Sequence, residues 1–157
     1  MNEDEIRVAR KRMVEEQIAA RGVLEPRLLA VMESVPRHLF VPADDLPWAY
    51  ADGPPPIGNA QTISQPYIVA LMTELLQVES TDRVLEVGTG SGYQAAVLGQ
   101  MAAQVHTVEV IPELAAQASR ILADLDYANV HVHSGDGSQG WQEAAPYAGI
   151  LVAAAAP

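Results

Sequence analysis

The second half of the chain alternates between segments with the pattern of strands and segments with the pattern of helices. Four short segments have the length and composition of strands, at 83–87, 105–110, 130–133 and 150–152. The first three are separated by apolar residues at helical spacing over 93–101 and 112–125. Strands and helices at this spacing form βαβ units. We therefore expect an α/β fold in which a parallel sheet has helices on both faces.

The first 60 residues have a different pattern, which predicts helices followed by a loop. Apolar positions indicate a helix from Ile6 to Arg21 that stops at Gly22, and a second helix between Pro26 and Pro36. Residues 42–58 are rich in proline and predict an ordered loop. A third helix is expected over 65–76, with these apolar residues on one side: Ile68, Leu71, Met72, Leu75 and Leu76.

The length of 157 residues predicts a single domain. In this domain, residues 1–60 form the N-terminal helices and loop and residues 61–157 form the α/β core. The net charge of −11 argues against sequence-independent binding to the phosphate backbone of nucleic acids. The chain has no cysteine, no secretory signal pattern and no apolar run long enough for a membrane span. We therefore expect a cytoplasmic protein without disulfides or thiolate metal sites.

A glycine-rich segment, Gly88-Thr89-Gly90-Ser91-Gly92, follows the first predicted strand of the sheet. Glycine tolerates a positive φ and lets a ligand approach the backbone closely. Tyr93 stands where the dinucleotide fingerprint has its third glycine, which disfavours a nicotinamide dehydrogenase. Glu86 lies two residues before the first glycine, as in proteins that bind S-adenosylmethionine (SAM). The loop therefore predicts SAM as the cofactor.

Acidic residues stand at the ends of three consecutive predicted strands. Glu86 belongs to the first, Glu109 to the second, and Asp136 follows the third between Gly135 and Gly137. A carboxylate accepts two neighbouring hydroxyl groups, as ribose binding requires, and Asp136 suits an adenine amine. Each acid alone has another interpretation: Glu109 as a helix-start acid and Asp136 as a turn residue. The three together favour a ligand site.

Ser64 and the histidines have plain structural interpretations when they are considered alone. Ser64 is a candidate helix N-cap, with Pro66 in the first helical turn. His131 and His133 fall on the same face of one predicted strand, but no third ligand is apparent nearby. A packing or surface role is therefore favoured, and no metal is expected.

Taken together, these segments resemble the protein-L-isoaspartate O-methyltransferase family of SAM-dependent repair enzymes. The resemblance runs through "RMVEEQIAARGV" (12–23), "VPRHLFVP" (35–42), "AYADGPPPIGNAQTISQPYIVALM" (49–72) and "VLEVGTGSGYQAAVL" (84–98). Other methyltransferases share the glycine-rich loop but not "QTISQPYIVALM". The resemblance implies a Rossmann-like methyltransferase fold with an N-terminal helical extension.

The resemblance also implies an activity and a set of site residues. The family transfers a methyl group from SAM to the α-carboxylate of L-isoaspartyl residues in damaged proteins, and S-adenosyl-L-homocysteine is the other product. Ser64 matches the residue usually assigned to the active site. The expected cofactor-binding residues are Gln61, Thr62, Ile63, Ser64, Tyr67, Glu86, Gly88, Thr89, Gly90, Ser91, Gly92, Glu109, Val110, Gly135 and Asp136.

The family's sheet continues past the fourth strand, whereas this sequence stops at Pro157. We therefore expect a fold truncated after the fourth strand, with an edge at 150–152 that would allow self-association. The alternative to an isoaspartyl methyltransferase is accordingly a non-catalytic remnant that binds SAM without methylating a substrate.

Overall fold

A computed structural model describes residues 1–53, 56–58 and 61–153, with the backbone alone at 56–58 and 61. The chain forms two compact units, Met1–Leu75 and Leu76–Pro157, each described here by itself. Residues 61–75 group with the N-terminal helices, and the predicted division of a single domain at residue 60 stays a prediction. No helix in the described ranges is both long and apolar enough to cross a membrane.

The first unit begins with a long helical segment. Helix α1 (Glu3–Arg12) is capped by a reciprocal pair in which Asn2 and Glu5 each accept the other's backbone N–H. It continues through a π-helical stretch, η1 (Met13–Ile18), and a 3₁₀ turn, η2 (Ala19–Arg21). Gly22 then ends the segment at a φ of 96°, which a residue with a side chain rarely adopts. The predicted helix and its glycine stop are confirmed.

The remaining elements of the first unit are short. Helix α2 (Pro26–Ser34) is followed by the 3₁₀ turns η3 (Arg37–Phe40) and η4 (Ala43–Trp48), and helix α3 (Pro66–Leu76) ends the series. Between η4 and α3, strand β1 (Pro56–Gly58) pairs antiparallel with β2 (Gln61–Thr62). The prediction of a plain loop over 42–58 was therefore wrong, because it missed a 3₁₀ turn and one strand of this small hairpin.

Helix α3 buries a different side from the one that its large apolar residues suggested. Val69, Ala70 and Thr73 are buried, whereas Ile68 is 37% exposed and Leu75 is 72% exposed. The Thr73 hydroxyl donates to the Val69 carbonyl oxygen at 2.8 Å, which satisfies its polar group inside the unit. Hydrophobicity alone missed this face because two of its residues are small or polar.

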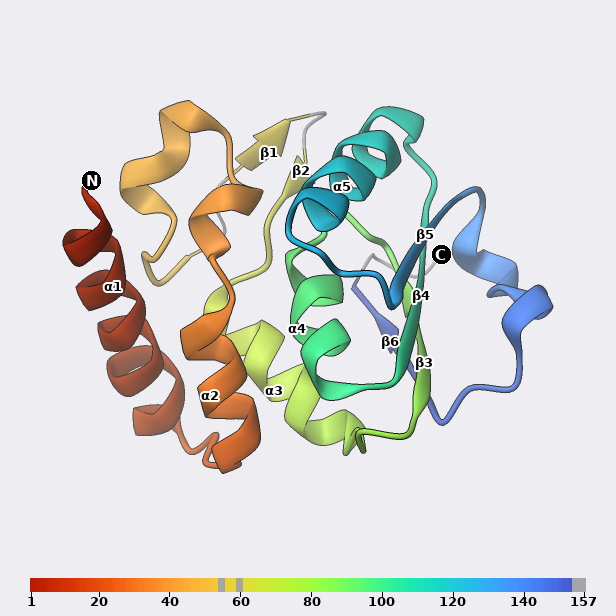
Figure 1. The fold of residues 1–157 in the computed structure, drawn as a ribbon, viewed down its shortest axis with the longest axis horizontal. Helices are drawn as coiled ribbons and strands as arrows, with labels where there is room; N and C mark the ends of the chain where they lie inside the picture. The colour runs from red at the N-terminus through yellow and green to blue at the C-terminus, as the bar shows by residue number, and fades with distance from the viewer. Residues whose placement is uncertain (54–55, 59–60, 154–157) are drawn as a thin grey trace. The chain divides into compact units, whose positions relative to one another are not determined.

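The second unit contains a parallel sheet of four strands in the order β5-β4-β3-β6 (Figure 1). In chain order these are β3 (Arg83–Val87), β4 (Gln104–Glu109), β5 (Val130–Ser134) and β6 (Gly149–Val152). Helix α4 (Tyr93–Met101) joins β3 to β4, and α5 (Pro112–Asp124) joins β4 to β5. The predicted α/β fold and its strands are confirmed. From β3 the chain adds β4 and β5 on one side and then returns to add β6 on the other side of β3. Ligands bind at such a reversal of strand order in sheets of this type.

The two faces of the sheet have different coverings (Figure 1). Helices α4 and α5 pack on one face against β4 and β5. The single-turn helices η5 (Gly137–Gln139) and η6 (Gln142–Ala144) belong to the segment over the other face. Gly137 and Gly140 in this segment approach Val87 and Leu85, respectively. A β-carbon at Gly137 would lie 2.6 Å from Val87 Cγ1, so only glycine fits there without a shift.

Strand β6 lies at one edge of the sheet. Among the described strands it pairs with β3 alone, and its side chains Ile150 and Val152 are 56% and 46% exposed. Self-association through this edge stays a prediction.

Candidate functional site

The glycine-rich loop forms a tight turn between β3 and α4. Gly88, Gly90 and Gly92 have φ values of 93°, 54° and 90°, in the region that favours glycine. The Gly88 N–H donates to the Val108 carbonyl oxygen at 2.8 Å, which fixes the start of the loop on strand β4. The Ser91 hydroxyl accepts from the Tyr93 N–H at 3.2 Å. The loop thus has the positive-φ glycine backbone that the sequence indicated, and its contact with a ligand stays a prediction.

Glu86 lies buried beneath this loop. It has no exposed surface, and its Oε1 accepts a hydrogen bond from Thr107 Oγ1 at 2.7 Å. The hydroxyls of Thr107 and Thr89 are 2.6 Å apart, so a chain of hydroxyls connects Glu86 to the loop. Burial, with a smaller contribution from Glu109, raises the pKa of Glu86 from 4.5 to about 8. The side chain is therefore protonated at neutral pH, and within the described residues its Oε2 has no hydrogen-bond partner.

Glu109 joins the loop to the start of α5. The side chain is 6% exposed; Oε1 accepts from the Gly90 N–H at 2.8 Å and Oε2 from the Ile111 N–H at 2.9 Å. The bond from the Ile111 N–H agrees with the helix-start interpretation. Each oxygen keeps a lone pair for another donor, and the ligand interpretation stays a prediction. Val110 follows at the strand end and is 67% exposed.

Asp136 has the geometry of a turn residue. Its Oδ1 accepts from the Ser138 N–H and its Oδ2 from the Ser138 hydroxyl, both at 2.9 Å. These bonds hold the pKa of Asp136 below its usual value. The Gly135 N–H donates to the Glu109 carbonyl oxygen at 2.9 Å, which keeps the ends of β4 and β5 together. A role for Asp136 toward adenine stays a prediction.

The residues at the carboxyl ends of β3 and β4 suit a cofactor with the chemistry of SAM. The unpartnered Oε2 of Glu86 is a buried polar atom, and the loop is followed by the N-terminus of α4, where a carboxylate is favoured. The exposed Val110 offers an apolar surface at the same strand end. The residues present therefore fit the cofactor that the sequence predicted.

The second group of predicted residues belongs to the first unit. Thr62 is exposed, Ile63 is buried and Ser64 is half-buried between β2 and α3, while the side chain of Gln61 lies outside the described residues. Helix α3 begins at Pro66, and the Gln65 carbonyl oxygen accepts the Val69 N–H. The prediction of Ser64 as the N-cap was therefore wrong, because Gln65 occupies the flanking position. To the described residues, the Ser64 hydroxyl makes no hydrogen bond.

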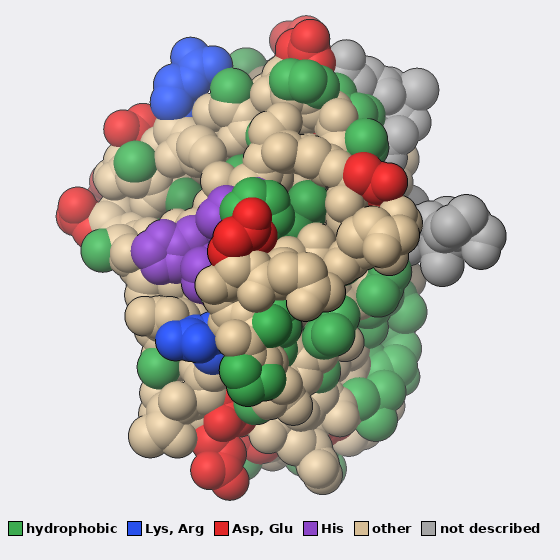
Figure 2. Space-filling view, turned by 90° about the vertical axis from the view of Figure 1, so that its right-hand side faces the viewer, with side chains coloured by type: hydrophobic (Ala, Val, Ile, Leu, Met, Phe, Trp, Pro, Cys, Tyr) green, Lys and Arg blue, Asp and Glu red, His purple; other side chains and the backbone are tan. Residues whose placement is uncertain are grey.

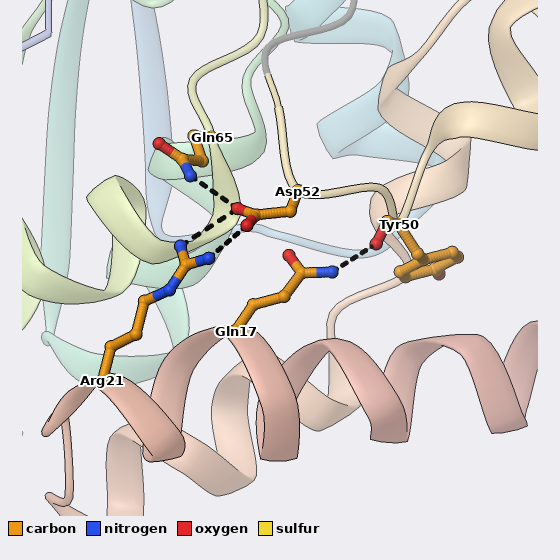
Figure 3. Close-up of polar contacts among 5 residues, drawn as sticks. All are labelled: Gln17, Arg21, Tyr50, Asp52 and Gln65. Atoms are coloured by element: carbon orange, nitrogen blue, oxygen red, sulfur yellow. Dashed lines mark hydrogen bonds and ion pairs between the residues drawn. The ribbon is translucent and has the colours of Figure 1, made fainter.

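Sequence reasoning missed two residues that contact this segment. Arg37 is fully buried and donates from Nη2 to the Ser64 carbonyl oxygen at 2.9 Å. Asp52 accepts from Gln65 Nε2 at 2.5 Å and pairs with Arg21 (Figure 3). The only signals in the sequence were the segments "VPRHLFVP" and "AYADG", which carried the resemblance but no chemical prediction for either side chain.

Three of the four histidines gather on the sheet face opposite α4 and α5 (Figure 2). His131 and His133 share that face with His106, whose Nδ1 lies 2.9 Å from His133 Nε2. Trp141 stacks on His133 with ring centroids 3.9 Å apart. In the described part of the chain, no group of three or more potential ligands is arranged to hold a metal ion. The packing role favoured from the sequence agrees with these contacts.

A comparison with known protein families gives one model that matches residues 8–157, described as protein-L-isoaspartate(D-aspartate) O-methyltransferase. The chain belongs to this family. Two curated members are a protein-L-isoaspartate O-methyltransferase of Trichlorobacter lovleyi, 56% identical over 96% of the chain, and one of Methanoregula boonei, 60% identical over 94%. A Synechococcus member is 57% identical over 94%. The chain spans 69%, 68% and 61%, respectively, of these three relatives.

Solved structures agree with this family assignment. A protein-L-isoaspartate O-methyltransferase matches 91% of the chain with a TM-score of 0.81 and 29% identity, and 47% of that protein is covered. A beta-aspartate methyltransferase from Plasmodium falciparum in complex with S-adenosyl-L-homocysteine matches 94% of the chain, with a TM-score of 0.78, 23% identity and 74% of that protein covered. The second likeness supports the Rossmann-like fold alone.

Proposed function

We propose that this chain transfers the methyl group of SAM to the α-carboxylate of L-isoaspartyl residues in damaged proteins. The observation that carries the proposal is the identity of 56% to 60% with relatives named protein-L-isoaspartate O-methyltransferase, which extends over at least 94% of the chain. This range includes both Ser64 and the glycine-rich loop.

The proposed reaction needs positioning more than proton transfer. SAM, when bound, supplies an electrophilic methyl group on a sulfonium. The nucleophile is a substrate carboxylate that is already ionised near neutral pH, so no general base is required. A carboxylate oxygen forms a bond to the methyl carbon while the bond from that carbon to sulfur breaks, which leaves a methyl ester and S-adenosyl-L-homocysteine. The task of the chain is therefore to orient the reactants and exclude water.

Roles are assigned to the glycine-rich loop and to three of the predicted site residues. The N-terminus of α4 suits the carboxylate tail of the cofactor, and the free lone pairs of Glu109 suit the ribose hydroxyls. Asp136 is assigned to the adenine amine. Ser64 is assigned to the substrate carboxylate, since a hydroxyl without another partner in the described chain can donate a charge-assisted hydrogen bond.

The proposed substrates are isoaspartyl-containing proteins and peptides of the cytoplasm. The net charge of −11 disfavours acidic substrates at long range, although physiological salt screens this repulsion beyond about 8 Å.

Radiolabelled SAM with an isoaspartyl peptide and its normal aspartyl twin tests the proposal. Methyl ester on the isoaspartyl peptide alone is the expected result. Calorimetric binding of SAM without any transfer would favour a SAM-binding module that does not methylate, and no binding of SAM would exclude both functions.

The variant Ser64→Ala tests the role of the hydroxyl. We expect kcat to fall about 10- to 100-fold, because the substrate carboxylate loses an orienting hydrogen bond. The affinity for SAM, measured by calorimetry, should stay within about threefold. An equal loss of both quantities would show that Ser64 maintains the pocket and does not orient the substrate.

A further inference from the structure

Residues 49–52 of the first unit are held by side chains from η1 and η2, which continue helix α1, and from η3. The Ala49 carbonyl oxygen accepts from Arg37 Nε at 2.7 Å. The Tyr50 carbonyl oxygen accepts from Gln17 Nε2 at 2.8 Å (Figure 3). The Tyr50 hydroxyl lies 2.7 Å from His38 Nδ1. Ala49 and Tyr50 are themselves buried. The segment is therefore a fixed support and not a free loop.

The same segment is connected to the Ser64–Gln65 peptide at two points. Arg37 uses one guanidinium for both attachments, since Nε binds Ala49 and Nη2 donates to the Ser64 carbonyl oxygen at 2.9 Å. Asp52 accepts from Gln65 Nε2 at 2.5 Å. Arg21 donates to the same Asp52 oxygen as Gln65 and, with Gln65, keeps the pKa of Asp52 below its usual value (Figure 3).

The connection through Arg37 is buried, whereas the connection through Asp52 is partly exposed. A variant at Asp52 can therefore test positioning with little effect on stability. Arg37 has no exposed surface, and a buried guanidinium is tolerated only when its donors are satisfied. Its planar fork therefore fixes the distance between the carbonyls of Ala49 and Ser64. The side chains of Arg21 and Asp52 remain 38% and 37% exposed, where an ion pair adds little to the free energy of unfolding. The contact between Asp52 and Gln65 therefore fixes the position of the Ser64–Gln65 peptide. Its removal should change the free energy of unfolding little.

We propose that Arg37 and Asp52 are positioning residues for Ser64, which hold the Ser64–Gln65 peptide against residues 49–52 and thereby set the direction of the Ser64 hydroxyl. This inference rests on the proposed function, in which that hydroxyl orients the substrate carboxylate. Neither side chain is assigned a contact with the substrate. Their effect reaches the reaction through the backbone on both sides of Ser64.

The variant Asp52→Ala tests the inference with little risk to folding. We expect kcat for the isoaspartyl peptide to fall about tenfold, because a displacement of less than about 1 Å is costly in an oriented reaction. The affinity for SAM and the midpoint of thermal unfolding should change little. Glu16→Ala is the matched control, since it removes an exposed ion pair with Arg12 that has no connection to Ser64. A similar loss of kcat in both variants would overturn the inference.

Conservative and double variants separate positioning from a general loss of packing. Asp52→Asn keeps an oxygen that can accept from Gln65, so kcat should stay within about threefold of the wild-type value. Gln65→Ala removes the same hydrogen bond as Asp52→Ala, so the double variant should be no slower than either single variant. Additive losses in kcat would contradict the proposed connection.

Amide hydrogen exchange gives a readout that does not depend on activity. In Asp52→Ala and in Arg37→Lys, which cannot bridge two carbonyls with one rigid fork, the amides of residues 62–65 and 67 should exchange faster than in the wild type. The amides of strand β3 should be unchanged. Unaltered exchange at residues 62–65 and 67 in both variants would reject the positioning role. If the wild type transfers no methyl group, the proposed function fails by itself, and the exchange data still decide the positioning role.

Discussion

The buried carboxyl of Glu86 should make the free energy of unfolding depend on pH. In the folded chain its pKa is about 8, against an ordinary value of 4.5, chiefly because burial disfavours the charged form. A group whose pKa is raised on folding stabilises the folded state fully below its unfolded pKa. That stability is lost as the pH rises through the folded pKa. The contribution of Glu86 should therefore decline between pH 4.5 and about 8.

The variant Glu86→Gln isolates this contribution. Glutamine has the shape of the protonated acid and its Oε1 can still accept from Thr107, but it does not titrate in this range. The difference between 4.5 and about 8, at about 1.4 kcal/mol for each pH unit, corresponds to roughly 5 kcal/mol in total. From pH 5 to pH 8, the stability of the wild type relative to the variant should fall by on the order of 4 kcal/mol.

Urea unfolding of both proteins at pH 5, 6, 7 and 8 measures the difference directly. Taking the difference cancels titrations that the two proteins share, including those of the histidines. Glu113→Gln, an exposed position in the same unit, controls for the removal of one negative charge. Parallel curves for wild type and Glu86→Gln, with a constant offset, would refute the assignment of a protonated Glu86 in the folded chain.

The same variant tests the relation between Glu86 and the cofactor. A cationic ligand at the glycine-rich loop favours the ionised form of a nearby carboxyl, so SAM should displace the Glu86 proton. Calorimetry near pH 7 in two buffers of different ionisation enthalpy should detect proton release in the wild type and none in Glu86→Gln. Equal proton release in the two proteins would show that the ligand does not act on Glu86.

Two further predictions concern the sheet face opposite α4 and α5. Gly137→Ala should lower the free energy of unfolding by about 1–3 kcal/mol in urea titrations, because the new β-carbon would lie 2.6 Å from Val87 Cγ1. Gly135→Ala, whose β-carbon meets nothing within 4 Å, should change it by less than about 0.5 kcal/mol. Burial, with smaller contributions from the neighbouring histidines and Arg83, lowers the pKa of His106 from 6.5 to about 4. The stability that His106 contributes is therefore present above pH 6.5 and lost as the pH falls through 4, and thermal unfolding of His106→Phe should be less sensitive to acid than that of the wild type.

The elements of the sheet could be predicted from the sequence because their signals are local. Strand β3 runs directly into three glycines, and its predicted bounds at 83–87 match the structure. Pro112 sets φ for the first turn of α5 and thereby marks its start. The hairpin of β1 and β2 could not be predicted in this way. Its strands are very short, and the proline-rich sequence before it hides the pairing.

The candidate site was predictable only where its residues follow one another in the chain. The glycine-rich loop and Glu109 belong to the strand ends that the pattern had already located. The state of Glu86 depends on burial by distant residues, so a sequence pattern cannot reveal its pKa. Arg37 reaches Ser64 from 27 residues away and Asp52 reaches Gln65 from 13. Such contacts arise only when the chain is folded.

The central claim is most directly tested by the transfer of label from methyl-labelled SAM to an equimolar mixture of one isoaspartyl peptide and its aspartyl twin. The two peptides are separated after the reaction and the methyl ester on each is counted. The account predicts label on the isoaspartyl peptide alone, and much less in Ser64→Ala at saturating SAM. Equal label on both peptides, or no label on either while SAM binds, would contradict it.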